Sequence, residues 1–351
     1  MSEKEKKLKD SAAHPTSKYS SSLLLNVQNL KVVFNVMEGC LQAVNGVSFT
    51  IERGKVMALV GESGCGKTVT SYSILKLIQA PGKIVEGSIV FNSLDGYSVD
   101  MVKLSDNDKM LYKIRGGKIS MIFQEPMTAF SPVHTIGDQI CEAILLHQKI
   151  SKQEAKDKAI EMMRKVGISF PEKRIFQYPF EMSGGMRQRA MIAMALVCNP
   201  ELLIADEPTT ALDVTIQAQI IFLIKKLQQE LGTSILLITH DLGVVAQMAD
   251  DVSIMYLGKI VEKANVKTIL KNPQHPYTKG LIKSLPGFDN NANRLFSIKG
   301  SVPSLLNIPS GCAFYPRCEY FKDGICNVGN PPPLEEITKN HFVACARIKE
   351  I

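Results

Sequence analysis

The sequence predicts an α/β fold with a parallel sheet at its core, and three observations support this prediction. Residues 55–60 (KVMALV) form an apolar run suited to a buried strand, and residues 68–77 carry apolar side chains at helical spacing. A glycine-rich turn, residues 61–68, joins these two segments. A second apolar run, residues 202–207 (LLIADE), ends in two carboxylates, as a central parallel strand can.

The glycine-rich turn GESGCGKT has the G-x-x-x-x-G-K-T pattern of a phosphate-binding loop. Glycines allow backbone N–H groups to curl around phosphate oxygens, Lys67 can reach the β and γ phosphates, and the hydroxyl of Thr68 suits Mg²⁺. A chance glycine-rich turn is the alternative, and the strand-to-helix context argues against it. We expect Cys65, inside the loop, to be only a small filler. The predicted nucleotide-binding residues of this loop are Gly61, Ser63, Gly64, Cys65, Gly66, Lys67 and Thr68.

The two carboxylates after the second run fit the same chemistry. Asp206 can hold Mg²⁺ through water, and Glu207 can polarise an attacking water. Alone, the pattern is weak evidence, since strands often end in a solvated acid. It gains value from the phosphate loop upstream. Lys67 and Asp206 are separated by 138 residues, more than a βαβ unit requires, so we expect an inserted subdomain.

The segment EMSGGMRQR, residues 181–189, lies within this insert. Ser183 can cap the following helix, while Gly184 and Gly185 let the backbone approach an anion at the positive end of the helix dipole. A simple capped helix start is the alternative. The segment resembles the signature of ATP-binding cassette (ABC) proteins, which implies that it faces a γ phosphate.

Further motifs of the ABC pattern follow the expected order. They are FQEP at residues 123–126, ALD at residues 211–213, and His240 after the apolar run 235–238. The resemblance implies that Gln124 senses Mg²⁺ and links the site to membrane subunits. It implies that Asp213 shapes a dimer interface and that His240 contacts the γ phosphate. Phe34 resembles the aromatic residue that stacks on adenine, although a core aromatic residue in a strand is nearly as good an interpretation.

Three segments resemble the ATP-binding subunits of oligopeptide and dipeptide importers. They are MRQR after the signature glycines, QEPMT at residues 124–128 and NPQHPYT at residues 272–278. The resemblance implies an ATP-hydrolysing subunit that powers peptide import. An importer of nickel or another small solute is the alternative, because such subunits share the HPY segment. An ABC ATPase acting on DNA would need heptad coiled coils or basic inserts, which the sequence lacks, and the intact ATP motifs argue against a module without turnover.

The resemblance also implies partners. One chain supplies half of each composite site, so we expect a second, related ABC ATPase, with a homodimer as the alternative. Two transmembrane permease subunits and an extracellular or periplasmic peptide-binding protein complete the expected assembly. The chain is then a peripheral protein at the cytoplasmic face of the cell membrane, and no nucleic acid is expected.

Composition agrees with these expectations. The chain has 351 residues, 45% of them hydrophobic, which is enough for a large core. No apolar run reaches the length of a bilayer span. The net charge of +7 is modest, and we interpret it as a solvated surface because no basic cluster with interleaved aromatic residues is present.

The predicted organisation is a disordered N-terminal arm at residues 1–22, an ABC ATPase domain at 23–285 and a C-terminal extension at 286–351. The ATPase domain is expected to contain a RecA-like parallel sheet core and an antiparallel β subdomain, with strands at 24–36 and 41–51. We expect an inserted helical subdomain at about 134–182, a long helix at 213–231 and a buried strand at 233–239. The loop-rich extension is expected to pack separately from the phosphate loop.

The extension contains a cluster of four cysteines, Cys312, Cys318, Cys326 and Cys345, with the spacing C-x₅-C-x₇-C-x₁₈-C. A small loop-rich segment needs a staple, and a reducing cytosol disfavours disulfides. Four thiolates suit either tetrahedral zinc or an iron–sulfur cluster, and free thiols are the remaining alternative. The pattern is similar to the extension of some dipeptide-importer ATPases, which implies a [4Fe–4S] cluster. The other expected cofactors are ATP and Mg²⁺.

Overall fold

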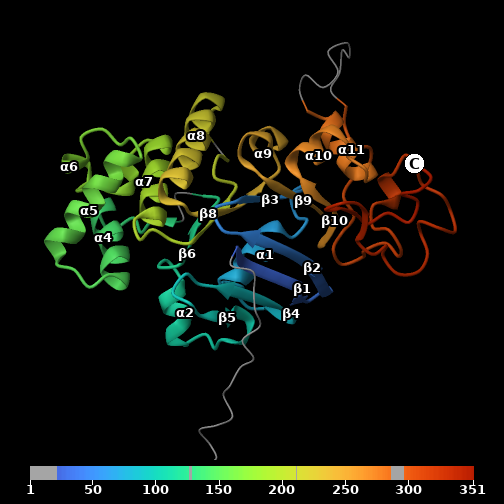
Figure 1. Ribbon diagram of the computed structural model, residues 1–351, viewed down its shortest axis with the longest axis horizontal. Coiled ribbons are helices and arrows are strands. Elements are labelled where there is room, and N and C mark those ends of the chain that lie inside the picture. The colour runs from blue at the N-terminus through green and yellow to red at the C-terminus, as the bar shows by residue number, and fades with distance from the viewer. Residues whose placement is uncertain (1–21, 126–128, 211, 286–295) are drawn as a thin grey trace, which may run out of the picture.

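The protein is organised around one mixed sheet and one antiparallel sheet, shown in Figure 1. The computed structural model describes residues 22–125, 129–210, 212–285 and 296–351. Within these ranges the larger sheet has eight strands. Their spatial order is β11 (Glu335–Thr338), β12 (His341–Val343), β10 (Lys259–Asn265), β9 (Asp251–Tyr256), β3 (Val56–Val60), β8 (Ser234–Thr239), β7 (Leu202–Asp206) and β6 (Ile119–Ile122).

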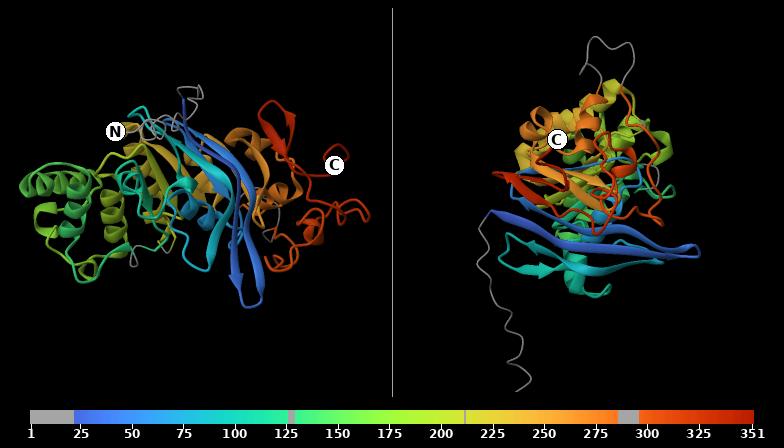
Figure 2. Two further views of the ribbon diagram at one scale, coloured as in Figure 1. Left: turned by 90° about the horizontal axis from the view of Figure 1, so that it is seen from below. Right: turned by 90° about the vertical axis from the view of Figure 1, so that its right-hand side faces the viewer.

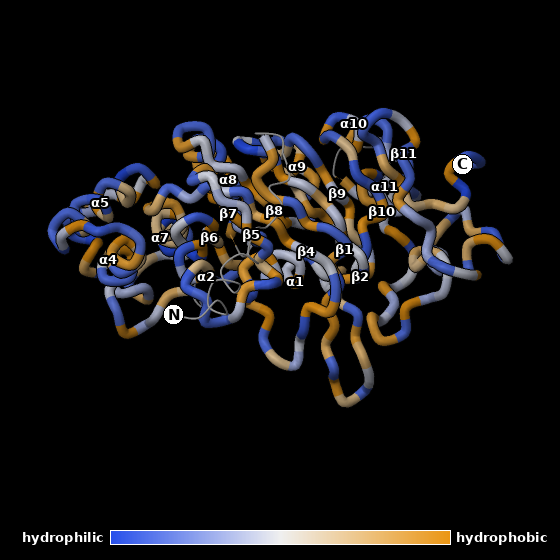
Figure 3. Tube along the Cα trace, turned by 60° about the horizontal axis from the view of Figure 1, so that its bottom comes forward, coloured by the Kyte–Doolittle hydropathy of each residue, from blue (hydrophilic) through white to orange (hydrophobic). Residues whose placement is uncertain are grey.

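The strands from β9 to β6 are parallel, whereas β10, β12 and β11 pair antiparallel at the other edge. Parallel strands covered on both faces are apolar throughout. In β3, Met57 and Leu59 face one core, and the alternate residues Val56, Ala58 and Val60 face the other. Figure 3 shows the resulting concentration of hydrophobic residues around β8 and β9. The predicted α/β fold with a parallel sheet core is confirmed.

The smaller sheet lies against one face of the main sheet as a separate layer (Figure 2). Its order is β2 (Gly39–Glu52), β1 (Leu23–Val36), β4 (Gly82–Asn92) and β5 (Ser98–Asp100), and all of its pairs are antiparallel. The strands predicted at residues 24–36 and 41–51 correspond to β1 and β2. Apolar residues from both sheets, from α1 (Lys67–Ile74) and from α2 (Lys109–Ile114) form the core between the layers.

Helices cover the opposite face of the main sheet (Figure 1). They are α8 (Val214–Leu231), α9 (Leu242–Met248), α10 (Val266–Lys271) and α11 (Pro276–Lys283). The predicted long helix is α8, which Asp213 caps at its N-terminus and which ends at Gly232 with φ 68°. No helix within the described ranges is long and apolar enough to span a membrane.

The segment between β6 and β7 is helical, and most of it lies at one end of the molecule. It contains α4 (Ile136–His147), α5 (Lys152–Lys165), α6 (Pro171–Arg174), the 3₁₀ turn Pro179–Glu181 and α7 (Gly184–Leu196). Helix α5 begins at a capping box, in which Ser151 and Glu154 exchange hydrogen bonds between side chain and backbone. The exact bounds of a helical subdomain at 134–182 stay a prediction.

The C-terminal segment shares the main core. β12 pairs with β10, with Val343 opposite Glu262, and Phe314 packs against Tyr256 and Tyr277. A single-turn 3₁₀ segment, η3 (Tyr315–Arg317), follows Phe314. The expectation that this segment packs separately is therefore wrong, because its strands complete a sheet that contains β3. The boundary at 285/286 stays a prediction, and residues 286–295, like most of the predicted arm at 1–22, lie outside the described residues.

Candidate active site

The phosphate loop connects the buried end of β3 to the start of α1. Gly66 precedes α1 with φ 101° and makes no side-chain capping bond, so the first N–H groups of the helix are not capped by a side chain. A Cβ atom at Gly66 would lie 2.2 Å from the carbonyl oxygen of Ala43, which requires glycine there. Ser63 and Gly64 are exposed, while Cys65 is buried and its apolar contacts fit the predicted filler. The loop presents a helix N-terminus that suits an anion.

Lys67 is folded back into this loop. Its Nζ donates to the carbonyl oxygens of Gly61 at 2.7 Å and Glu62 at 3.0 Å, and the residue is only 5% exposed. Both acceptors are neutral carbonyls. A phosphate oxygen would offer a charge-assisted bond instead, so this ammonium group can turn toward a bound phosphate.

Asp206 and Thr68 form the part of the site that fits a magnesium ion. The hydroxyl of Thr68 lies 3.4 Å from Oδ1 of Asp206, and Oδ2 is buried without a hydrogen-bond partner among the described residues. Burial, opposed by the bond from Thr68 and reinforced by Glu207, raises the pKa of Asp206 to about 6. A buried carboxylate oxygen with no partner beside a hydroxyl is a donor set that suits a hydrated cation.

Glu207 is the point at which the predicted catalytic residues meet. Its Oε1 lies 3.3 Å from Nδ1 of His240, and its Oε2 accepts from Nε2 of Gln124 at 3.3 Å. Oε2 also accepts a bond of 2.9 Å from the hydroxyl of Thr210. The carboxylate next to Asp206 is therefore held by three polar side chains from three separate segments, and it can orient a water molecule.

Sequence reasoning missed two residues that support this arrangement. Thr210 follows Glu207 by three residues, and this short spacing was the feature of the sequence that could have indicated a contact between the two side chains. Gln188 of α7 is 2% exposed and donates a 2.6 Å bond to the carbonyl oxygen of Pro208. It ties the signature helix to the turn that follows Glu207. A polar residue on the buried face of a helix was the signal in this case.

The signature residues lie at the start of α7. Ser183 caps the helix and accepts from the N–H of Met186, as predicted. Ser183 and Gly184 are exposed, and a Cβ atom at Gly184 would meet nothing within 4 Å. Figure 1 shows α7 among the helices at the left of the molecule and α1 below the middle of the main sheet. The structure thus gathers Gln124, Glu207 and His240 near the phosphate loop and leaves the signature open to solvent.

Two further predicted residues have structural partners. Asp213 caps α8 by accepting from the N–H of Ile216 at 3.0 Å. Phe34 lies in β1, partly buried, with its ring against Gly82. The predicted roles of both residues in dimer contact and adenine stacking stay predictions. The motif at residues 124–128 is described only at Gln124 and Glu125, and Ala211 lies outside the described residues.

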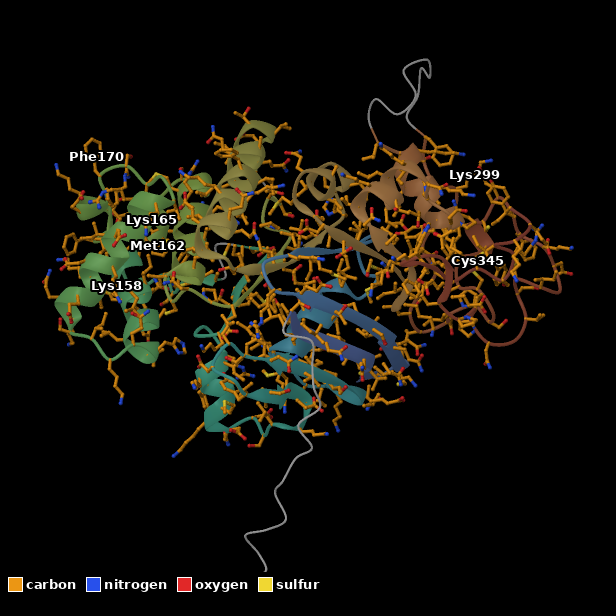
Figure 4. All side chains as sticks on the ribbon, viewed as in Figure 1. Lys158, Met162, Lys165, Phe170, Lys299 and Cys345 are labelled. Atoms are coloured by element: carbon orange, nitrogen blue, oxygen red, sulfur yellow. The ribbon has the colours of Figure 1, made fainter. Side chains whose placement is uncertain are left out.

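The four cysteines of the C-terminal segment line one cavity together with His275 and Phe314. None of the four forms a disulfide, and burial raises the pKa of Cys312 to about 11. Among the residues with described positions, no group of three or more His, Cys, Asp or Glu side chains is placed to hold a metal ion. The predicted [4Fe–4S] cluster therefore stays a prediction. Figure 4 shows Cys345 in this segment, at the end of the molecule opposite Met162 of α5.

Comparison with known proteins agrees with this site. Residues 44–210 match the family model for the ABC transporter, and residues 261–326 match that for the oligopeptide/dipeptide transporter C-terminal region. The oligopeptide transport ATP-binding protein AppD of Bacillus subtilis is 53% identical over 330 residues, which cover 94% of this chain and 98% of AppD. The dipeptide transport ATP-binding protein DppD of the same organism is 53% identical over 296 residues, covering 84% of this chain and 86% of DppD.

Solved structures show the same fold. The dimeric post-hydrolysis state of the ATP-binding cassette MJ0796 bound to ADP and Pi superimposes with a TM-score of 0.61 at 26% identity. It covers 69% of this chain and 99% of that one. The phosphate loop, the acidic strand and the signature helix together define an ABC-type ATPase. With the matched C-terminal region, the chain belongs to the family of ATP-binding subunits of oligopeptide and dipeptide ABC transporters.

Proposed function

We propose that this chain is the ATP-hydrolysing subunit that powers peptide import through an ABC transporter. The relatives named above are ATP-binding proteins of oligopeptide and dipeptide transport, and the similarity to AppD covers nearly the whole chain. The observation that carries the catalytic part is the carboxylate of Glu207, within 3.3 Å of both Gln124 and His240.

Each side chain takes a defined role in this proposal. Lys67 and the N–H groups of the phosphate loop bind the β and γ phosphates, and Phe34 stacks on the adenine. Glu207 orients water for attack on the γ phosphorus, and His240 contacts the γ phosphate. The residues that would hold Mg²⁺ are Thr68, Asp206 and Gln124, and the ion would neutralise charge on the phosphate oxygens.

We propose that a second ABC ATPase completes the site. Ser183 and Gly184 are exposed at the N-terminus of α7, where they offer an anion site that the rest of this chain leaves open. The superimposed cassette MJ0796 is dimeric. In the proposed pair, the signature of each subunit, with Gly185, faces the γ phosphate on the other subunit. Asp213 lies at the interface.

The remaining partners follow from the family. We propose two transmembrane permease subunits and an extracellular or periplasmic peptide-binding protein. The chain then acts as a peripheral protein on the cytoplasmic face of the membrane. The names of the relatives support this assembly, since transport ATP-binding proteins act with a membrane pathway.

Cargo class separates this proposal from its alternative, import of nickel or another small solute. The complex with its permease and binding-protein partners, in vesicles, is tested with labelled di- and oligopeptides and with labelled nickel. We expect ATP-dependent uptake of peptides and none of nickel. Nickel uptake without peptide uptake would favour the alternative, and DNA-stimulated hydrolysis without uptake would favour an enzyme acting on DNA.

We also propose that Cys312, Cys318, Cys326 and Cys345 hold a [4Fe–4S] cluster. Support comes from the four thiols lining one cavity and from the match to the transporter C-terminal region. Anaerobically purified protein should be brown and contain iron and acid-labile sulfide in near-equal amounts. Stoichiometric zinc in colourless protein would replace the cluster with a zinc site. Protein without metal would leave plain thiols.

A further inference from the structure

An ion pair joins the C-terminal segment directly to the phosphate loop. Nη1 of Arg317 lies 2.6 Å from Oε2 of Glu62, and Nη2 lies 3.0 Å from Oε1. The two residues are 255 positions apart in the chain. The Arg317 side chain is only 4% exposed and that of Glu62 is 28% exposed. Two parallel bonds between a guanidinium and a carboxylate fix direction as well as distance.

The guanidinium of Arg317 is held in place from its other sides. Nε donates to the carbonyl oxygen of Lys299 at 3.2 Å, and the group lies 5.9 Å from the ring centre of Tyr256 and 6.0 Å from that of Phe314. Aromatic faces attract a guanidinium. Arg317 is also the last residue of η3, which begins directly after Phe314. The C-terminal segment therefore presents a preorganised cation.

Glu62 is tied to the nucleotide-binding machinery through its backbone. Its carbonyl oxygen accepts from Nζ of Lys67 at 3.0 Å, and its N–H donates to the hydroxyl oxygen of Tyr277 at 3.0 Å. Tyr277 belongs to α11 and is fully buried. Moving Glu62 would therefore disturb both the loop and the lysine that reaches the phosphates.

We propose that Arg317 is a positioning residue for ATP binding, which acts through Glu62. The bidentate pair holds the phosphate loop in its open cradle before nucleotide arrives. It also neutralises a carboxylate that would otherwise repel the incoming triphosphate. The inference rests on the proposed function, and it makes the C-terminal segment part of the wall of the nucleotide site.

The test is a double-mutant cycle on the full chain, with the affinity for the magnesium complex of a non-hydrolysable ATP analogue measured by calorimetry. We expect Arg317→Gln to weaken binding about tenfold, because it breaks a charge-assisted pair and leaves Glu62 unpaired. Glu62→Gln removes the repulsive charge. The double variant Glu62→Gln/Arg317→Gln should therefore bind no more weakly than Glu62→Gln alone.

Arg53→Gln is the matched control. Arg53 also pairs with a carboxylate, through a single bond of 3.0 Å between its Nη1 and Oε2 of Glu201, and it donates to the carbonyl oxygen of Asn92. None of these groups belongs to the phosphate loop. We expect Arg53→Gln to lower the melting temperature while leaving nucleotide affinity unchanged. If Arg53→Gln loses as much nucleotide affinity as Arg317→Gln, general destabilisation explains both losses. That result would overturn the inference.

Four outcomes would contradict either the inference or the proposed function. If a folded Arg317→Gln variant binds the nucleotide as tightly as wild type, Arg317 does not affect ATP binding. If the losses of affinity in the double variant are fully additive, Arg317 does not act through Glu62. Either result would overturn the inference. If Arg317→Gln does not fold, Arg317→Lys keeps the charge without the bidentate geometry, and it should still bind several-fold more weakly than wild type. Wild-type affinity in Arg317→Lys would overturn the inference. A wild-type chain that binds no ATP would instead contradict the proposed function.

Discussion

Glu207 has a backbone conformation that few non-glycine residues adopt. Its φ is 45°, and its N–H donates to the carbonyl oxygen of Ile238 in the neighbouring strand β8. Such strain persists where the surrounding structure enforces it, and it is common at functional sites. Here it turns the chain sharply after Asp206, so that consecutive carboxylates serve different partners. Asp206 faces Thr68, and Glu207 faces Gln124 and His240.

We expect Glu207→Gln to lower the rate of ATP hydrolysis in the assembled complex by about a hundredfold or more. The amide cannot polarise water, while the phosphate contacts proposed for Lys67 are left unchanged, so ATP should stay bound. Phosphate release and retained labelled ATP are the measurements. Glu172→Gln, at an exposed glutamate paired with Arg164, is the control and should hydrolyse ATP normally. Turnover within a few-fold of wild type would refute this catalytic assignment.

Single residues were predictable from the sequence when a local pattern marked them. The run LLIADE placed both carboxylates at the end of a strand, and Ser183 could be read as a helix cap. Thr210 and Gln188 were not predicted, because the turn after Glu207 determines which groups they contact. A turn with an unusual backbone conformation has no simple sequence pattern.

Among the elements, the segment that leads into α11 is organised by one buried carboxylate. Glu262 of β10 is fully buried and accepts from the N–H groups of Gln274 at 2.8 Å and His275 at 2.9 Å. Its Oε1 also lies 2.7 Å from Nε2 of His341 in β12. The carboxylate thereby joins β10, the start of α11 and β12. This gives a physical role to part of the motif that resembled peptide importers.

His275 caps α11, since its Nδ1 accepts from the N–H of Tyr277 at 3.1 Å. Burial lowers the pKa of His275 to about 4, against an opposing effect of Glu262. The unfolded chain binds this proton near pH 6.5 and the folded chain only near pH 4. The contribution to stability is therefore present above pH 6.5 and is lost as the pH falls toward 4.

We predict that the free energy of unfolding of the wild type falls between pH 7 and pH 4 by about 3 kcal/mol more than that of His275→Asn. Asparagine retains a capping acceptor and does not titrate. Denaturant titrations of the full chain at several pH values provide the comparison. Parallel pH dependence in the two proteins would show that His275 is not the group responsible. Groups that titrate elsewhere in the chain affect both proteins equally, so they do not contribute to the difference between the two unfolding free energies.

Helices and strands could be predicted from the sequence where the spacing of apolar residues agreed with the residues that begin and end the element. Alternation predicted β1 and β2, and α8 followed from its amphipathic pattern, with Asp213 before it and Gly232 after it. β11 and β12 were missed. β11 has four residues and β12 has three, which are too few to reveal an alternation of apolar and polar residues. The pairing of β12 with β10 is a long-range contact that local sequence does not encode.

At the scale of the whole molecule, the C-terminal segment completes the sheet and touches the phosphate loop. The sequence indicated a loop-rich appendage that would struggle to form its own core. That segment instead buries Phe314 in the main core of the ATPase, and its Val343 is also buried. The ion pair between Arg317 and Glu62 spans most of the chain, so sequence spacing could not reveal it. We therefore expect the C-terminal segment and the nucleotide site to respond to each other.

The exposed signature provides the central prediction at this scale. In the proposed dimer, a full nucleotide site combines Ser183 of one cassette with the phosphate loop of the other. Arginine at position 183 would place a bulky cation at the opening of α7 and remove the hydroxyl. We expect Ser183→Arg subunits, mixed with a cassette that has an intact phosphate loop, to block the site formed between that loop and the altered signature.

The most direct measurement is phosphate release per chain as the purified full chain is diluted, with and without the second cassette. We predict that release is negligible for dilute chains alone and rises to saturation as the second cassette is added. When the Ser183→Arg chain replaces the wild-type chain, phosphate release should rise less. The part that is lost is the hydrolysis at the site to which this chain contributes its signature. A full rate of hydrolysis that is independent of dilution and of the second cassette would contradict the composite site.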